Sequence, residues 1–255
     1  MLQAHSPLWN YLWVAPNVLL LILAALIWGR GLRRLFPAFL AFAVLSAIGQ
    51  LAVFVADVAP SVSAENFWVV DWVSLLTEGT LKFVLIAEIF ACVFDPYPSV
   101  AKLGKFLIRA VGVALVLTSA VAAAYAPKGT YALISGAHLL EQTIYLIECG
   151  LLIFVFLFSS YFRLSWDRPL FGIALGLSVS ACVHLATWAV LANTNLSTAN
   201  RHYLDFLNMA TYHACVLIWF YYLLVPQKAV IKSAVPLPEN NLAVWNRELE
   251  RLLHQ

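Results

Sequence analysis

The sequence predicts an all-α protein that crosses a membrane several times. Apolar residues make up 63% of its 255 positions and charged residues only 11%, whereas soluble domains carry about 25% charged residues. The mean hydropathy is +0.85, and the apolar residues fall in runs long enough for helices that span a bilayer. A net charge of +2 gives no indication of nucleic-acid binding. The lipid bilayer is therefore the first partner that the sequence predicts.

Seven apolar runs predict seven transmembrane helices. They are Trp13 to Trp28, Phe39 to Val55, Phe67 to Phe94, Phe106 to Tyr125, Tyr131 to Phe158, Leu170 to Ala192, and Tyr203 to Val225. The segments between them contain the residues typical of turns, such as Arg30-Gly31. Several of these segments are short, so neighbouring helices are expected to run antiparallel. We expect residues 1–225 to form one transmembrane domain, followed by a tail of residues 226–255.

The distribution of Lys and Arg predicts the orientation of these helices. Twelve of them lie in the loops after the first, third and fifth runs and in the tail, whereas only Lys128 and Arg201 lie on the other side. Cytoplasmic loops are enriched in Lys and Arg, so the N-terminus is expected outside and the C-terminus in the cytoplasm, in a plasma (inner) membrane. The Arg cluster follows the first apolar run instead of preceding it, which argues against a cleaved signal peptide.

The tail is expected to end in an amphipathic helix over residues 240–255. Asn240 or Asn241 is a good N-cap, and an apolar stripe follows it on one side of the helix. The candidate partner-binding residues on this stripe are Leu242, Trp245, Leu249 and Leu252. Such a helix lies on the inner membrane surface, docks on a separate partner chain, or packs against the protein's own inner loops.

Ionisable residues inside the apolar runs are the candidate functional residues, because a charge near the bilayer centre costs several kcal/mol unless it faces protein or water. The candidates for ligand binding or a proton relay are Glu78, Lys82, Glu88, Glu141, Glu148, His184 and His213. Glu78 and Lys82 have the i, i+4 spacing of a helical ion pair. Glu141 and Glu148 lie seven residues apart and so share a helix face.

The depth of these residues predicts that several of them meet. At a rise of about 1.5 Å per residue, Glu78, Glu141 and His213 lie roughly 15 Å below the outer end of their spans, and His184 lies roughly 12 Å below it. Four ionisable groups from four helices therefore share a level. Lys82 comes one to two turns deeper, as does Glu148, so we expect one polar cluster in the interior.

The sixth run carries a row of small residues that indicates close helix packing. Gly172, Gly176 and Ser180 repeat every fourth residue and lead to His184. Such small-xxx-small rows let a second helix approach closely. His184 is therefore expected to face protein and not lipid.

The residues of this cluster can be compared with those of metal, haem and retinal sites. Two carboxylates and two histidines suit zinc, iron or manganese, but di-metal bundles use Glu-x-x-His repeats and this chain has only the reversed His138-x-x-Glu141. Facing histidines His184 and His213 would suit a haem. The last run holds no lysine for a retinal Schiff base. We predict no metal ligand set, and the sequence names no cofactor.

Three further interpretations of the cluster stay open. The acids descend towards the cytoplasm as a proton relay would, which suits a proton-coupled carrier or channel. The same pocket could bind a small ligand in a receptor-like or assembly subunit. In a purely structural interpretation, Glu78 and Lys82 neutralise each other, and the histidines hydrogen-bond between helices.

The sequence contains no motif that indicates catalysis. It lacks GxSxG, HExxH, a Walker loop and a GxGxxG between strand and helix. The four cysteines lie one to each of four runs without CxxC spacing, so neither a disulfide framework nor a zinc knuckle is expected. Composition and motifs therefore favour a protein that is not an enzyme.

Short stretches along most of the chain resemble an uncharacterised family of bacterial seven-span membrane proteins. The stretches are Arg30 to Pro37, Glu88 to Phe90, Cys149 to Trp166, Phe171 to Gly176, Val216 to Trp219, and Trp245 to Arg247. The resemblance implies a bacterial inner-membrane protein and brings no activity with it.

The leading hypothesis is a non-enzymatic ligand-binding, sensory or assembly subunit. A proton-coupled carrier or channel is the second hypothesis, and a metal-dependent membrane enzyme is the third. In the leading case Glu78, Lys82, Glu141, His184 and His213 line the binding cavity. A separate cytoplasmic or membrane partner chain would then bind the tail helix.

Overall fold

The computed structural model describes residues 5–31, 34–94, 130–161, 166–193 and 198–225, together with the single positions 106, 110, 113, 164 and 251. The fourth predicted span, Phe106 to Tyr125, therefore lies almost wholly outside the described residues. So do the predicted tail helix and its apolar residues Leu242, Trp245, Leu249 and Leu252.

The described part of the chain is all helical. Its six helices are α1 (Pro7–Gly29), α2 (Pro37–Val58), α3 (Ala64–Val93), α5 (Thr130–Tyr161), α6 (Arg168–Asn193) and α7 (Thr198–Leu224). Within the described residues, five segments are long and apolar enough to cross a membrane: Pro7–Gly29, Pro37–Val58, Leu140–Tyr161, Arg168–Leu191 and Arg201–Leu224. The 30 residues of α3 would also reach across a bilayer, although this helix carries buried charges. The chain is a multi-pass membrane protein.

Local signals explain where several helices begin and end. The Ser6 side chain caps α1 by accepting a hydrogen bond from the backbone N–H of Trp9 at 3.3 Å. Ser63 caps α3 in the same way, also at 3.3 Å, from the N–H of Asn66. Gly31 follows α1 with a φ of +73°, which favours glycine. Both α1 and α3 begin before their apolar runs, because caps and polar first turns fall outside a hydropathy pattern.

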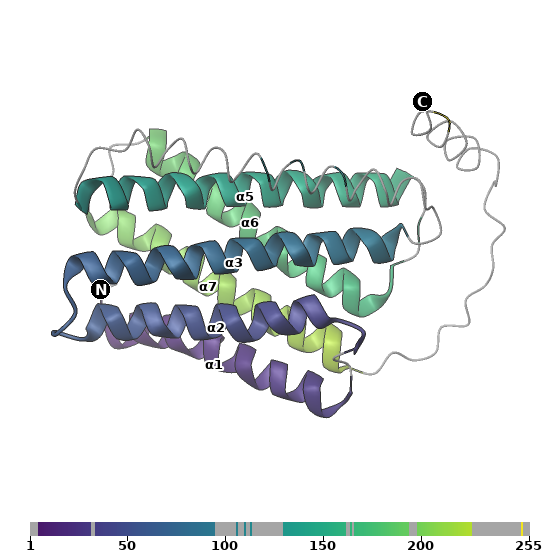
Figure 1. Cartoon of the computed structure of the whole chain (residues 1–255), viewed down its shortest axis with the longest axis horizontal. Coiled ribbons are helices and arrows are strands. Elements are labelled where there is room, and N and C mark those ends of the chain that lie inside the picture. The colour runs from purple at the N-terminus through teal and green to yellow at the C-terminus, as the bar shows by residue number, and fades with distance from the viewer. Residues whose placement is uncertain are drawn as a thin grey trace.

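The six helices form a closed ring. Each packs against the next in the order α1, α2, α3, α5, α6, α7 and back to α1, and α3 also contacts α6 across the ring. Figure 1 shows the long helices side by side, with α3 and α5 beginning at the same end of the molecule. We call the end of the ring where α1, α3, α5 and α7 begin the open end, and the opposite end the core end.

The hydrophobic core fills only the core end of the ring. Its most buried members come from the half of each helix that lies at this end. They include Leu20, Leu23, Ile27, Phe39, Phe42, Leu85, Ile86, Ile89, Leu152, Val155, Ile173, Leu177 and Trp219. Trp219 of α7 joins three helices, because its ring packs on Phe39 and Phe42 of α2 and its Nε1 donates to the carbonyl of Ile173 on α6 at 3.3 Å.

The small residues of α6 face α7, as the packing row predicted. A Cβ added at Gly172 would collide with Tyr222, and one added at Gly176 would collide with Trp219. These two glycines therefore set the close approach of α6 and α7.

Candidate functional site

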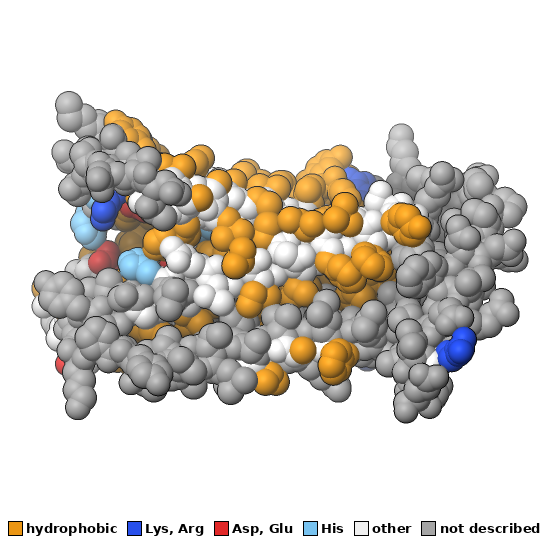
Figure 2. Space-filling model, turned by 90° about the horizontal axis from the view of Figure 1, so that it is seen from above, with side chains coloured by type: hydrophobic (Ala, Val, Ile, Leu, Met, Phe, Trp, Pro, Cys, Tyr) orange, Lys and Arg blue, Asp and Glu red, His pale blue; other side chains and the backbone are white. Residues whose placement is uncertain are grey.

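Three adjoining cavities occupy the open half of the ring. Their volumes are about 230, 270 and 730 Å³, and Trp13 and Glu141 line all three. Because they share walls, we treat them as one polar cavity. Figure 2 shows histidine, acidic and basic side chains gathered around a hollow at one end of the molecule.

The floor of the polar cavity is an ion triad of Glu78, Lys82 and Glu148. The Lys82 ammonium lies 3.1 Å from Glu78 Oε1 on the same helix and 3.3 Å from Glu148 Oε2 on α5. Gln50 of α2 donates to the other oxygen of Glu78 at 3.1 Å. Lys82 also lies 4.4 Å from the centre of the Tyr145 ring, a cation–π contact.

Because the triad is buried, its charged side chains depend on one another for a counter-charge. The side chain of Glu148 is fully buried and that of Lys82 is 5% exposed. A buried carboxylate without a counter-charge is strongly disfavoured, so Lys82 holds Glu148 in place. One ammonium faces two carboxylates, which leaves the triad with a formal charge of −1.

Glu141 and His184 lie above the triad. The His184 ring stacks on Tyr145 with 4.2 Å between ring centres, and its Nδ1 lies 3.0 Å from the carbonyl oxygen of Ser180. A carbonyl only accepts, so this hydrogen bond requires a proton on Nδ1. Glu141 lies one turn after His138, whose Nδ1 is 3.9 Å from Glu141 Oε2.

His138 lies just before the apolar segment Leu140–Tyr161, and its surroundings favour the imidazolium form. The Glu141 carboxylate, 3.9 Å away, is the main cause that raises the pKa of His138 above its usual 6.5, and the charge of Asp71 adds to it. The ring also packs between two tryptophans, with centres 6.4 Å from Trp68 and 5.1 Å from Trp188. His138 thus joins α3, α5 and α6 at the open end.

Aromatic rings form the walls of the widest branch of the cavity. Trp9 and Trp13 of α1 line one side, and Trp68 and Trp188 line it from α3 and α6. The two rings of α1 lie edge to face, 6.4 Å apart. Four tryptophans therefore surround a space that also contains carboxylates.

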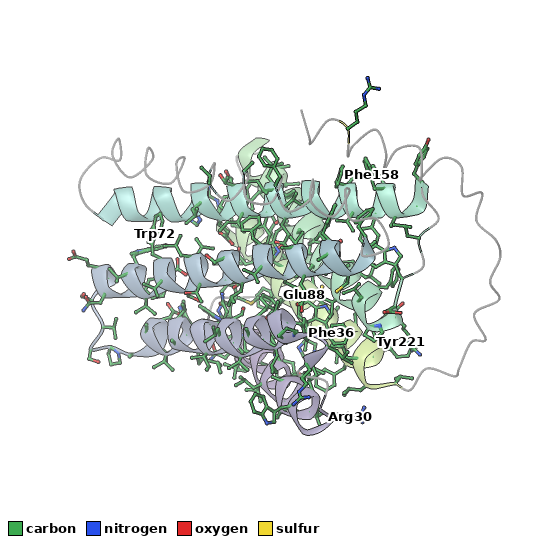
Figure 3. The ribbon with its side chains drawn as sticks, turned by 45° about the vertical axis from the view of Figure 1, so that its right-hand side comes forward. Arg30, Phe36, Trp72, Glu88, Phe158 and Tyr221 are labelled. Atoms are coloured by element: carbon green, nitrogen blue, oxygen red, sulfur yellow. The ribbon has the colours of Figure 1, made fainter. Side chains whose placement is uncertain are left out.

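Two predicted site residues lie apart from this cluster. Glu88 accepts a hydrogen bond from the backbone N–H of Ala38 at 3.2 Å, so it caps the first turn of α2. Figure 3 shows Glu88 near Phe36, far from Trp72 at the other end of α3. His213 packs against Tyr11 of α1, with ring centres 5.9 Å apart, and does not line the cavity. Depth along a helix could not give the direction in which His213 points.

The directions of His184 and His213 also argue against the haem hypothesis. His184 stacks on α5 and His213 packs on α1, so the two rings do not face each other across a shared space. No group of three or more His, Cys, Asp or Glu side chains that could hold a metal occurs among the described residues.

Sequence reasoning missed several residues that the fold brings to the cavity. Three of them are side-chain amides inside apolar runs: Asn17, Gln50 and Asn208. Asn17 is only 2% exposed, and its Oδ1 accepts no hydrogen bond from the described residues. An amide at such depth is itself a signal, since it is costly in lipid unless it faces protein or water. Beside the triad, the thiols of Cys149 and Cys182 lie 3.4 Å apart, which no sequence spacing indicated.

No protein-family model, curated protein or solved structure matches the chain. Membership of the bacterial seven-span family therefore stays a prediction from the sequence, and the function has to be argued from the cavity.

Proposed function

We propose that this protein binds a small molecule in the polar cavity and acts as a ligand-binding, sensory or assembly subunit of the membrane. The observation that carries this proposal is the shape of the interior: a polar cavity in the open half of the ring, ending on the ion triad, with the hydrophobic core beyond it. A pocket closed at one end suits binding better than passage.

The residues below the triad support a closed floor. Leu85, Ile86 and Ile89 follow Lys82 along α3, and all three are at most 1% exposed. Leu152 follows Glu148 along α5 and is also fully buried. A through-pathway would need these apolar side chains to separate, which would cost the free energy of their packing.

The lining of the cavity supports a role in which ligand binding changes how the helices pack. All six described helices contribute to the lining, from Trp13 on α1 to Met209 on α7. A ligand that contacts several helices favours the arrangement in which those contacts are best, and so shifts the packing of the ring. In the sensory form of the proposal, the predicted tail helix at 240–255 passes this change to a partner chain.

Asn17 supports a ligand with at least one hydrogen-bond donor. Asn17 lines the cavity, and its buried Oδ1 has no donor among the described residues. An unsatisfied buried acceptor costs about 1 to 3 kcal/mol, which a donor on the ligand would recover.

A cavity-filling substitution tests the proposal. Met209 lines two branches of the cavity, so Met209→Trp should exclude a ligand. Leu207→Trp makes the same change two residues earlier on the same helix, where the side chain is 48% exposed on the outside. Native mass spectrometry of the extracted full-length protein should show a bound small molecule in the parent and in Leu207→Trp but not in Met209→Trp. Equal occupancy in all three proteins would contradict the proposal.

One observation favours the proton-coupled carrier as a second candidate. Glu148 is fully buried, and Lys82 is its only charged contact in the described residues, which is an arrangement able to exchange a proton when Lys82 moves. Proton flux into liposomes is the test. A carrier should show flux that Glu78→Gln or Glu141→Gln abolishes, and absence of flux would remove this candidate.

A further inference from the structure

We propose that the ligand of the polar cavity is a small organic cation, such as a quaternary ammonium or a protonated amine. This inference rests on the proposed function, since it names the chemical class of the molecule that the cavity takes. It is argued from the charges and the aromatic rings of the lining.

Carboxylates outnumber cations in the lining. The acids are Asp71, Glu78, Glu141 and Asp205, and the cations are Lys82, Arg201 and the imidazolium form of His138. Lys82 is already shared between Glu78 and Glu148. A bound anion would therefore meet net repulsion, whereas a cation would gain.

Two of these acids have no Lys or Arg ion pair among the described residues. Glu141 has only His138 near it, at 3.9 Å, and Asp71 forms no ion pair there. Both line the branch of about 270 Å³, which Trp68 lines as well. A positively charged ligand placed there would add a second counter-charge to the one that the His138 imidazolium supplies.

The aromatic walls select an organic cation over an inorganic one. Trp9, Trp13, Trp68 and Trp188 line the widest branch, and tryptophan offers the strongest cation–π face. Such rings bind alkylated ammonium groups, whereas a metal ion would need several oxygen, nitrogen or sulfur ligands together. Lys82, 4.4 Å from the centre of the Tyr145 ring, already makes this kind of contact in the same cavity.

The dimensions of the site fit such a ligand. The widest branch holds about 730 Å³, within the usual range for small-molecule pockets. Asn208 and Gln142 line it as well and would orient a hydroxyl or amine substituent.

Binding of matched probes to the purified full-length protein tests this inference. Choline and 3,3-dimethyl-1-butanol have the same shape, with a charged nitrogen in the first and a neutral carbon in the second. Phenethylamine, protonated at pH 7, and 2-phenylethanol form a second pair. We expect at least one cation to bind at least tenfold more tightly than its neutral partner, and 3,3-dimethylbutanoate not to bind.

Substitutions then locate the binding. Glu141→Gln should weaken binding of the cation at least tenfold, whereas Glu65→Gln, at an exposed position in the first turn of α3, should leave it unchanged. Trp188→Leu should weaken it as well, whereas Trp28→Leu, 58% exposed at the core end, should not. Thermal unfolding of each variant reports whether it is folded, and the comparison between probes on the parent protein does not depend on any variant.

The outcomes separate this inference from the proposed function. If neutral probes bind as tightly as cations, or if none of the cations binds, the inference is overturned. A native adduct that Met209→Trp removes would still support the proposed function in that case. If cations bind but Glu141→Gln and Trp188→Leu bind them as the parent does, the site lies elsewhere and the inference is also overturned.

Discussion

Lys82 on α3 holds its ammonium group 3.3 Å from a carboxylate oxygen of Glu148 on α5, and the Glu148 side chain is fully buried. This contact joins two helices whose sequence separation gives no hint of it. It also fixes the depth at which the polar cavity ends and the hydrophobic core begins.

Replacing Lys82 by methionine should destabilise the protein. Lys82→Met keeps the length of the side chain but leaves the buried Glu148 carboxylate without its counter-charge, which costs about 3 to 5 kcal/mol when a buried pair is broken. Denaturant unfolding in micelles measures the loss. The double variant with Glu148→Gln removes the unpaired charge and should recover much of the stability. A single variant as stable as the parent would show that the ion pair does not hold α3 and α5 together.

Gly176→Ala should loosen the packing of α6 on α7. The added methyl group would lie 2.8 Å from Cε2 of the fully buried Trp219, so the indole has to move, at a cost of about 1 to 3 kcal/mol. Gly150→Ala on α5 is the matched control, because a Cβ there meets nothing within 4 Å. Alanine favours helix over glycine by up to about 1 kcal/mol, so this control should be neutral or stabilising. The same loss in both variants would contradict the packing explanation.

The stability of the open end should depend on pH through His138. Its pKa is raised in the folded protein, chiefly by the nearby Glu141 carboxylate, so the imidazolium stabilises the fold fully below pH 6.5. This stabilisation is lost as the pH rises through the higher folded value. Thermal unfolding of the parent and His138→Gln should therefore differ more at pH 5.5 than at pH 9. The substitution also removes the packing of His138 on Trp68 and Trp188, which lowers the unfolding temperature of the variant equally at both pH values. If the difference in unfolding temperature between the two proteins is the same at both pH values, the Glu141 contact does not stabilise the fold.

Cys149 and Cys182 should form a disulfide under mild oxidation. Their sulfur atoms lie 3.4 Å apart, and Cys182 is exposed, so a membrane-permeable oxidant such as diamide can reach the pair. The two thiols would lose two electrons and two protons to the oxidant, and the intact mass would fall by about two mass units. Cys182→Ser removes one partner and should abolish the change. If all four thiols of the parent still react with an alkylating agent after oxidation, α5 and α6 do not hold these residues together.

Much of the candidate site could be predicted because helical periodicity and depth are local properties. The i, i+4 spacing predicted the contact between Glu78 and Lys82, which lie 3.1 Å apart. The small residues of α6 predicted the close approach of a neighbouring helix. Direction across the bundle was harder to predict, since His213 packs on Tyr11 at the α1 side and does not line the cavity. Glu88, predicted as part of a relay, instead caps α2, a contact 50 residues away along the chain.

The sequence by itself determined that the chain enters a membrane as helices, because hydropathy and turn residues act over a single span. It also singled out the acids and histidines whose burial would need a reason. Only the tertiary structure decided which of them share a space. The order in which helices close the ring selects the faces that meet, and this order depends on packing between segments distant in the chain, from the glycines of α6 against Trp219 to Lys82 against Glu148.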